Sequence, residues 1–306
     1  MRPSSTAALA RRLGRRVGRA PRPALAPGPP TLRRAAADAA LRREGYVVVD
    51  LVDAGTVERL RDLCVAVHAE PRSGWASDFY TGDPETKRAV HEAIGRELRG
   101  AVDRDFVAHA SLLHNFVVNW PGPDGGLVLH QHSSVVDERR YRSVVVWCAL
   151  TPSTEANGTL HVVPRSHLLQ RGPRPEQAGS WAEDHEERLL RDHLVSVELE
   201  PGQAIVFDNQ LLHCSFANTT TSPRLTAVAI VLPTAAEPCY YEAAGPRVRV
   251  HRLDPEFFLE TQPGQLEWAR PEGLELLHEE PWSPLEVGVE DVRSTLPRGT
   301  CSHVPA

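Results

Sequence analysis

The sequence predicts a mainly β protein, built as an all-β barrel or jelly roll with helices before it. From residue 106 onward, short apolar runs alternate with turn signals such as DGG, NG, PG and SP. Residues 31–104 instead carry helical patterns with recognisable caps. Composition is that of a globular protein, with 41% hydrophobic and 24% charged residues. No apolar run reaches the roughly 18 residues of a membrane span, so we expect no integral membrane protein.

The helical region begins near Thr31, after an Arg/Ala/Pro-rich segment. The stretch TLRRAAADAALRREG predicts a helix with Thr31 as its N-cap and Gly45 as its stop. Residues 46–52 (YVVVDLV) predict a strand of β-branched residues. Asp53 is placed to cap a second helix, and Asp83, followed by proline, to cap a third.

The predicted strands follow in close succession. They cover residues 111–120, 127–136, 141–150, 159–163, 193–199, 203–207 and 224–232. Residues 170–190 are polar and are expected to form a loop over one end of the barrel, where they could act as a lid.

The domain organisation follows from these changes in sequence pattern along the chain. Residues 1–30 are expected to be a disordered tail, and residues 31–306 a single domain. That domain would comprise a helical flank (31–104), a β core (105–235) and a C-terminal extension (236–306).

Charge and cysteine content exclude several classes of protein. The net charge is −6, yet residues 1–34 hold nine arginines and no acid, so the remaining chain carries −15. A domain that acidic argues against specific nucleic-acid binding. The five cysteines include no CxxC pair, which argues against a disulfide framework or a zinc knuckle and favours the cytoplasm. The oligomeric state is not encoded in any pattern we recognise.

The most informative stretch is LHQHSSVVDE. His130 and His132 are two residues apart in a strand pattern, so both imidazoles are expected on one face of the sheet. A third histidine, His213, lies 83 residues after His130. Three ligands on one side of a metal leave its other positions free for substrate and O2, the facial arrangement of non-haem iron oxygenases.

An arginine that could bind an anion follows the third histidine in the sequence. Arg224 lies eleven residues after His213 and opens the strand RLTAVAIVL. Pointing into the same barrel, its guanidinium could pair with the far carboxylate of a dicarboxylate cosubstrate in a bidentate manner.

At this point the chain resembles the phytanoyl-CoA dioxygenase family of Fe(II)/2-oxoglutarate oxygenases, from about Glu44 to Pro233. EGYVVVDLVDAGTVERLRDL resembles the family's opening strand and helix. LHQHSSVVDERRYRSVVVWCALTPSTEANGTLHVVPRSHLL resembles its metal strand and the NGxLxVxPGSH turn. LEPGQAIVFDNQLLHCSFANTTTSPRLTAVAIVL resembles its distal-ligand segment.

The resemblance implies a double-stranded β-helix (jelly roll, cupin-like) with flanking helices. It also implies Fe(II) and 2-oxoglutarate as cofactors, and O2 and a small molecule as substrates. By position, His130 would be the first metal ligand, His213 the distal ligand and Arg224 the cosubstrate anchor. The implied reaction couples 2-oxoglutarate decarboxylation to hydroxylation, or another oxidation, of the small molecule.

One departure from the family pattern matters chemically. Where the family shows HxD or HxE, this chain has His130-Gln131-His132. A neutral imidazole removes no positive charge from the metal, which would make the metal a stronger Lewis acid. Either His132 is itself the third ligand, or Asp137 or Glu138 supplies the carboxylate.

Two alternative functions follow from this departure. One is a three-histidine metal dioxygenase that does not use 2-oxoglutarate, and the other is a non-catalytic ligand-binding protein of the same fold. Beside the metal strand, Asn115 and Asn119 are candidates for contacting 2-oxoglutarate, and Trp147 is a candidate for lining the substrate pocket.

Overall fold

The computed structural model describes residues 28–70, 73–81, 83–123, 125–170, 172–175, 178–260 and 273–299. Its main sheet comprises β1 (Tyr46–Asp50), β2 (Gly74–Ser77), β3 (His109–Trp120), β5 (Val144–Ala149), β8 (Gln203–Asp208) and β10 (Arg224–Pro233). The minor sheet comprises β4 (Leu127–His130), β6 (Leu160–Val162), β7 (Val195–Val197) and β9 (His213–Ser215). A third sheet comprises β11 (Cys239–Ala244), β12 (Arg247–Arg252) and β13 (Leu276–Pro281).

Seven α-helices are assigned in the described ranges. They are α1 (Ala35–Glu44), α2 (Ala54–Val67), α3 (Asp78–Thr81), α4 (Pro84–Asp105), α5 (Glu186–His193), α6 (Pro255–Glu260) and α7 (Val289–Thr295). None of the described helices is long and apolar enough to cross a membrane.

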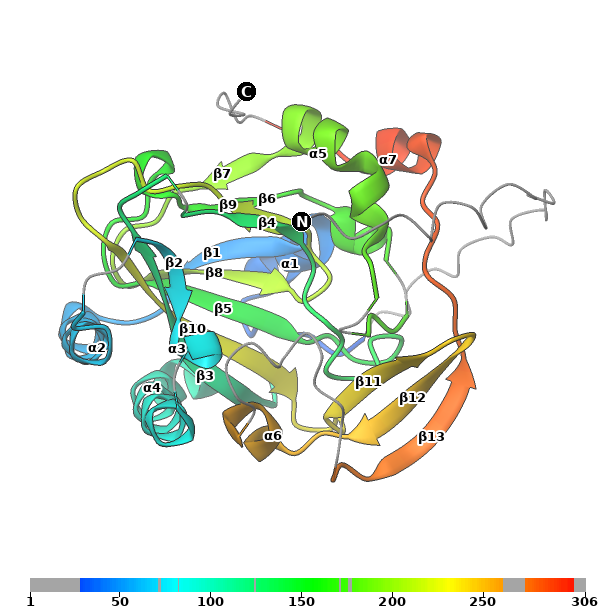
Figure 1. Ribbon diagram of the computed structural model, residues 1–306, viewed down its shortest axis with the longest axis horizontal. Helices are drawn as coiled ribbons and strands as arrows, with labels where there is room; N and C mark the ends of the chain where they lie inside the picture. The colour runs from blue at the N-terminus through cyan, green and yellow to red at the C-terminus, as the bar shows by residue number, and fades with distance from the viewer. Residues whose placement is uncertain are drawn as a thin grey trace, which may run out of the picture.

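The two larger sheets face each other as a jelly roll (Figure 1). The main sheet has the order β1-β8-β5-β10-β3-β2 and the minor sheet β4-β9-β6-β7, with antiparallel pairing between the neighbours. The predicted fold class, a mainly β double-stranded β-helix with flanking helices, is confirmed. The division into tail, flank, core and extension stays a prediction, and residues 1–27 of the expected tail lie outside the described residues.

Side chains of the main sheet alternate between two cores, as the period of two in a strand requires. On β5, Val144, Val146 and Cys148 belong to the core beneath the helices. Val145, Trp147 and Ala149 belong to the core between the two sheets. A strand that is buried on both faces has apolar residues at every position. This explains why the sequence of β5, VVVWCA, does not alternate between apolar and polar residues.

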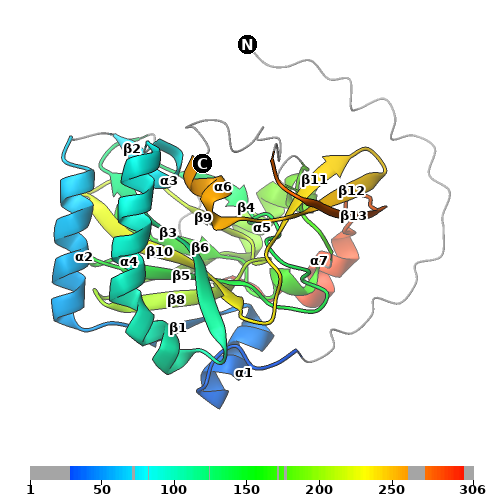
Figure 2. The ribbon, with the colours of Figure 1, turned by 90° about the horizontal axis from the view of Figure 1, so that it is seen from below.

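Helices α2 and α4 cover the outer face of the main sheet (Figure 2). The predicted caps are confirmed: Asp53 accepts a hydrogen bond from Thr56 N at 2.8 Å, and Asp83 accepts one from Thr86 N at 2.9 Å. Gly45 ends α1 with a left-handed φ of 87°, a conformation that glycine adopts without steric cost. These helices cover the face of the main sheet that points away from the minor sheet.

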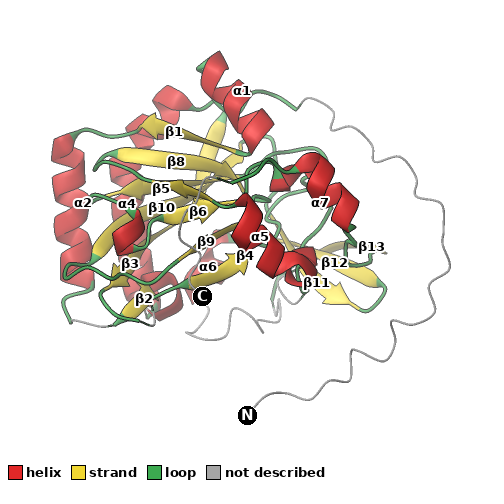
Figure 3. Ribbon diagram, turned by 90° about the horizontal axis from the view of Figure 1, so that it is seen from above, coloured by secondary structure: helices red, strands yellow, loops and turns green. Residues whose placement is uncertain are grey.

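The outer face of the minor sheet is covered by α5 and α7 (Figure 3). Leu129, Leu212 and Cys214 point outward into this core with Leu189 and Val292. Their sequence neighbours therefore point inward, between the sheets.

Several expectations about local structure are wrong. Thr31 does not cap the first helix, because α1 begins at Ala35 and Asp38 instead accepts from the Thr31 and Leu32 amides at 2.7 and 3.1 Å. The strand expected over 127–136 ends at His130. The expected loop at 170–190 contains a 3-10 helix, Trp181–His185, and the start of α5, because Trp181 and Leu189 bury their side chains under the minor sheet.

The third sheet packs beside the open end of the jelly roll (Figure 1). Cys239 N donates to Val135 O at 2.9 Å, and Arg139 forms an ion pair with Glu280 at 3.0 Å. Trp282 Nε1 donates to Pro173 O at 3.0 Å. The C-terminal extension is thereby attached to the segment that follows the metal strand and to residues 172–175.

Candidate metal centre

Three histidines from two strands and a loop converge between the sheets. The nitrogen atoms of His130, His132 and His213 that could bind a metal all lie within 4.8 Å of one another. Their ring centroids are 4.1 Å apart for His130 and His213, and 4.7 Å apart for His132 and His213. Bonds of about 2.1 Å to one ion place ligand atoms about 3–4 Å apart, so small side-chain adjustments suffice.

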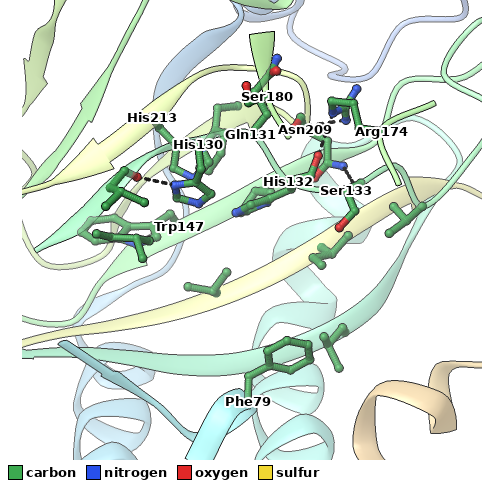
Figure 4. Close-up of a pocket in the computed structure, with 18 of the residues that line it drawn as sticks. Phe79, His130, Gln131, His132, Ser133, Trp147, Arg174, Ser180, Asn209 and His213 are labelled. Atoms are coloured by element: carbon green, nitrogen blue, oxygen red, sulfur yellow. Dashed lines mark hydrogen bonds between the residues drawn. The ribbon is translucent and has the colours of Figure 1, made fainter. Parts of the chain in front are cut away.

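The strand pairing explains this convergence. His130 on β4 and His213 on β9 are direct partners in the antiparallel ladder, where opposite side chains are close neighbours. Their neighbours Leu129, Leu212 and Cys214 point outward, so both histidines must point inward. His132 lies beyond the end of β4, and the loop, rather than strand alternation, brings its ring to the same place (Figure 4).

Backbone carbonyls fix the tautomers of two rings. His130 Nδ1 lies 2.8 Å from Val128 O, and His213 Nδ1 lies 2.9 Å from Leu211 O. An Nδ1–H that donates to a carbonyl leaves the Nε2 lone pair free for a metal. His132 Nδ1 makes no hydrogen bond to a backbone carbonyl, and the Asn209 side chain is its polar neighbour.

All three imidazoles are held in the neutral form. Burial, reinforced by the neighbouring His130, lowers the pKa of His132 to about 3. Burial and the two neighbouring rings lower the pKa of His213 well below its ordinary value, and burial also lowers that of His130. Neutral imidazole is the form that binds metals, so the group is ready to bind a cation at neutral pH.

The metal-ligand group in the described part of the chain contains no carboxylate. Asp137 pairs with Arg139 at 2.7 Å, and Glu138 pairs with Arg174 at 2.5 Å while accepting from Ser134 Oγ at 2.8 Å. Both acids are therefore engaged with arginines in this structure. Neither takes the position that the family pattern gives to a carboxylate.

Arg174 is a residue of this centre that the sequence did not reveal. Its Nε donates to the carbonyl of His132 at 2.8 Å (Figure 4), while its other nitrogens hold the buried Glu138. Asn209 contributes next to it, with Nδ2 donating to Ser133 O at 2.8 Å. These bonds fix the backbone of the His132 loop, across sequence separations of 36 to 76 residues that no local pattern spans.

Arg224 lies in the same cavity as the histidines. Its side chain is 1% exposed, donates to Gly158 O and lies 4.7 Å over the Trp147 ring. Its Nε has no hydrogen-bond partner, and it pairs with none of the described carboxylates. Burial lowers its pKa to about 9, so it remains charged at neutral pH and offers unused donors to an anion.

The other candidates take different positions. Asn115 lines the cavity, and its Nδ2 donates to Ser77 Oγ at 2.9 Å. Trp147 lines the cavity beneath Arg224. Asn119 is absent from the lining and donates to Phe216 O at 3.0 Å. Gln131, expected on the opposite face of the strand, lines the cavity and donates to Gln210 O, because β4 has already ended.

The cavity that holds these groups has a volume of about 840 Å³. Small-molecule sites typically have about 300–1,000 Å³, so the cavity has room for a cosubstrate and a substrate together. The three histidines and Arg224 all line this cavity. The cavity therefore contains a group that can bind a metal cation and a side chain that can bind an anion.

Comparison with known proteins supports a family assignment. The sequence model of the family described as Phytanoyl-CoA dioxygenase (PhyH) matches residues 41–226. A phytanoyl-CoA dioxygenase of Arabidopsis thaliana is 30% identical over 112 residues, 36% of this chain and 39% of that protein. A probable phytanoyl-CoA dioxygenase of Caenorhabditis elegans is 31% identical over 122 residues, 35% of this chain and 38% of that protein. The matches therefore span less than two fifths of those relatives.

A solved structure agrees on the fold. The non-heme alpha ketoglutarate dependent carbocyclase SnoK from nogalamycin biosynthesis superimposes with a TM-score of 0.51 at 18% sequence identity. The superposition covers 89% of this chain and 100% of that chain. Because the family match covers more than half of the sequence and includes the segments with all three histidines, the chain belongs to the phytanoyl-CoA dioxygenase family.

Proposed function

We propose that this protein is an Fe(II)- and 2-oxoglutarate-dependent oxygenase that oxidises a small molecule. In this proposal His130, His132 and His213 hold the metal, and Arg224 binds the distal carboxylate of 2-oxoglutarate. The observation that carries it is the meeting of three neutral imidazoles and one unpaired, buried guanidinium in a single cavity. Family membership and the name of the family support the same reaction class.

The residues present fit both cofactors. Three free imidazole nitrogens suit a divalent transition metal, and the unpartnered Nε of Arg224 suits a carboxylate oxygen. When bound, the iron and 2-oxoglutarate would supply the oxidising chemistry, with succinate and CO2 as products. The protein positions the substrate and keeps bulk water out of the cavity.

Charge balance distinguishes this centre from one with a carboxylate ligand. Fe(II), one carboxylate ligand and the 2-oxoglutarate dianion would sum to about −1, whereas three neutral histidines give about 0. His132 thereby leaves the metal a stronger Lewis acid. Arg174, paired with Glu138, adds no net charge while it fixes the His132 loop.

Metal binding and cosubstrate turnover test the proposal separately. Anaerobic titration with Fe(II) should show one metal per chain, and succinate should form only when Fe(II), 2-oxoglutarate and O2 are all present. Absence of metal binding with intact protein would favour a non-catalytic ligand-binding member of the fold.

A three-histidine dioxygenase without 2-oxoglutarate is the second candidate, and the carboxylate-free ligand group favours it. In that case Arg224 would bind a carboxylate of the substrate itself. Stoichiometric Fe(II) binding, together with O2 consumption that is independent of 2-oxoglutarate, would select this candidate over the first.

A further inference from the structure

Aromatic side chains gather around the cavity far beyond their share of the sequence. The chain has 6 Trp, 5 Tyr and 7 Phe, 6% of its residues. Half of them line this cavity: Trp75, Phe79, Tyr80, Trp147, Trp181, Phe207, Tyr240, Phe258 and Trp282. Trp147 is covered by the Arg224 guanidinium, Phe207 packs against His213, and Trp181 belongs to the core outside the minor sheet, which leaves the other six rings to contact a substrate.

Several of these rings form a continuous wall. Trp75 and Tyr80 have centroids 5.5 Å apart, Tyr80 and Phe79 are 5.0 Å apart, and Phe79 and Phe258 are 5.8 Å apart. Phe79 lies on the far side of the cavity from the histidines (Figure 4). Mutual packing fixes the ring orientations, so the wall is formed before any ligand arrives.

Part of this wall lies outside the segment that defines the family. Tyr240 is on β11, Phe258 on α6 and Trp282 just after β13, whereas the family match ends at residue 226. The bond from Trp282 to Pro173 and the Arg139–Glu280 ion pair attach this extension to the core. The C-terminal extension therefore contributes side chains to the cavity lining but none to the three-histidine group.

Charge is almost absent from the lining. No Asp, Glu or Lys occurs among the described lining residues, and the charged groups are Arg174 and Arg224. Arg174 is neutralised by Glu138, and Arg224 is assigned to the cosubstrate. Uncharged polar side chains are also present, such as Gln170. Apart from the attraction of aromatic faces for cations, the described lining offers no carboxylate to a cationic substrate and no unassigned cation to the phosphates of an acyl-CoA.

We propose that the substrate is an uncharged, flat, fused-ring molecule with hydroxyl or carbonyl substituents, held between the aromatic wall and the metal centre. Flat rings present faces and edges that suit offset and edge-to-face contacts with the wall, and an uncharged polar side chain such as that of Gln170 would bind its oxygens. This inference rests on the proposed function, because it names the substrate of the same cavity.

Binding to the metal-free protein tests the inference. The probe is 1,4-dihydroxyanthraquinone, followed by isothermal titration and by quenching of tryptophan fluorescence. The comparison ligands are the same ring bearing a quaternary ammonium group and phytanoyl-CoA. We expect the neutral ring to bind at least tenfold more tightly than either. Equal or tighter binding of the cation or of the CoA ester would overturn the inference, as would no binding of the ring.

Two wall variants and one control locate the binding. Phe258→Leu and Phe79→Leu keep apolar side chains but remove the rings, and each should weaken binding of the neutral probe at least fivefold. Phe106→Leu alters a ring buried beneath the helices, on the other face of the main sheet, and should leave binding unchanged. Unaltered affinity in both wall variants, with melting curves showing folded protein, would refute the proposed wall.

The experiments keep the two proposals separate. Ring binding is measured without metal, whereas the proposed function is measured by Fe(II) binding and succinate formation. Loss of ring binding with succinate formation intact would remove only the substrate assignment. Ring binding without metal binding would retain the ligand class and reject the oxygenase.

Discussion

Replacement of Arg224 by methionine should stabilise the protein without ligands and, at the same time, abolish its response to 2-oxoglutarate. The side chain is buried as a cation with no carboxylate partner among the described residues. A charge in that position destabilises the fold until an anion binds to it. The opposite effects on stability and on ligand response make this a sharp test of the anchor role.

The magnitude follows from the pKa. Burial lowers the pKa of Arg224 from 12.5 to about 9, and at about 1.4 kcal/mol per unit this corresponds to about 5 kcal/mol. The charged form is the disfavoured one, so the destabilisation is fully present below pH 9 and disappears as the pH rises from 9 towards 12.5. The bond to Gly158 O offsets about 1.5–3 kcal/mol. The Trp147 ring offsets about 0.5–2 kcal/mol.

The balance predicts a gain of about 0–3 kcal/mol for Arg224→Met, or up to roughly 5 °C in melting temperature. Thermal unfolding at pH 7.5 measures it, with and without Mn(II) and 2-oxoglutarate. Wild-type protein should melt higher with both ligands, and the variant should show no added shift from 2-oxoglutarate, because loss of a buried charge partner costs about 2–5 kcal/mol of binding.

A matched control lies two residues along the same strand. Thr226→Val removes a buried hydroxyl that has no partner, at a residue absent from the cavity lining, and should leave the 2-oxoglutarate response intact. The reasoning fails if Arg224→Met melts below the wild type without ligands, or if it keeps the full shift with 2-oxoglutarate.

Four further changes test the centre and the fold. His213→Ala should weaken Fe(II) binding at least about 100-fold in anaerobic titrations, and unchanged affinity would exclude it as a ligand. His132→Asp should keep or increase succinate formation if the centre is an ordinary facial triad with one ligand exchanged; loss of a natural activity would show that the three-histidine form is the working one. Arg174→Met leaves Glu138 buried and unpaired and should lower the free energy of unfolding in urea by about 3–5 kcal/mol, with recovery in the double variant carrying Glu138→Gln. Burial lowers the pKa of His114 from 6.5 to about 3. As the pH falls below 7, this histidine is therefore protonated in the unfolded chain before it is protonated in the folded protein. Stability should fall by about 2 kcal/mol from pH 7 to pH 5 on this account, and His114→Gln should reduce that slope.

Local features were readable from the sequence because their partners are close along the chain. The caps Asp53 and Asp83 act on amides three residues away, and Gly45 ends α1 through its own backbone conformation. The strand runs from residue 144 onward were recognisable by their β-branched residues. Thr31 failed as a cap because α1 begins only at Ala35, and Asp38 in the first turn of that helix accepts from the Thr31 amide.

The sequence by itself determined a mainly β barrel or jelly roll, from its strand periodicity, and the three candidate histidines and the arginine, from short motifs and the family resemblance. Only the tertiary structure decided that His132 joins the other two after its strand has ended, and that Arg174 and Glu138 hold its loop. It likewise decided that the rings of Phe79 and Phe258 meet in one wall of the cavity. Contacts between segments so far apart arise from sheet pairing and burial of the whole chain, which no local pattern encodes.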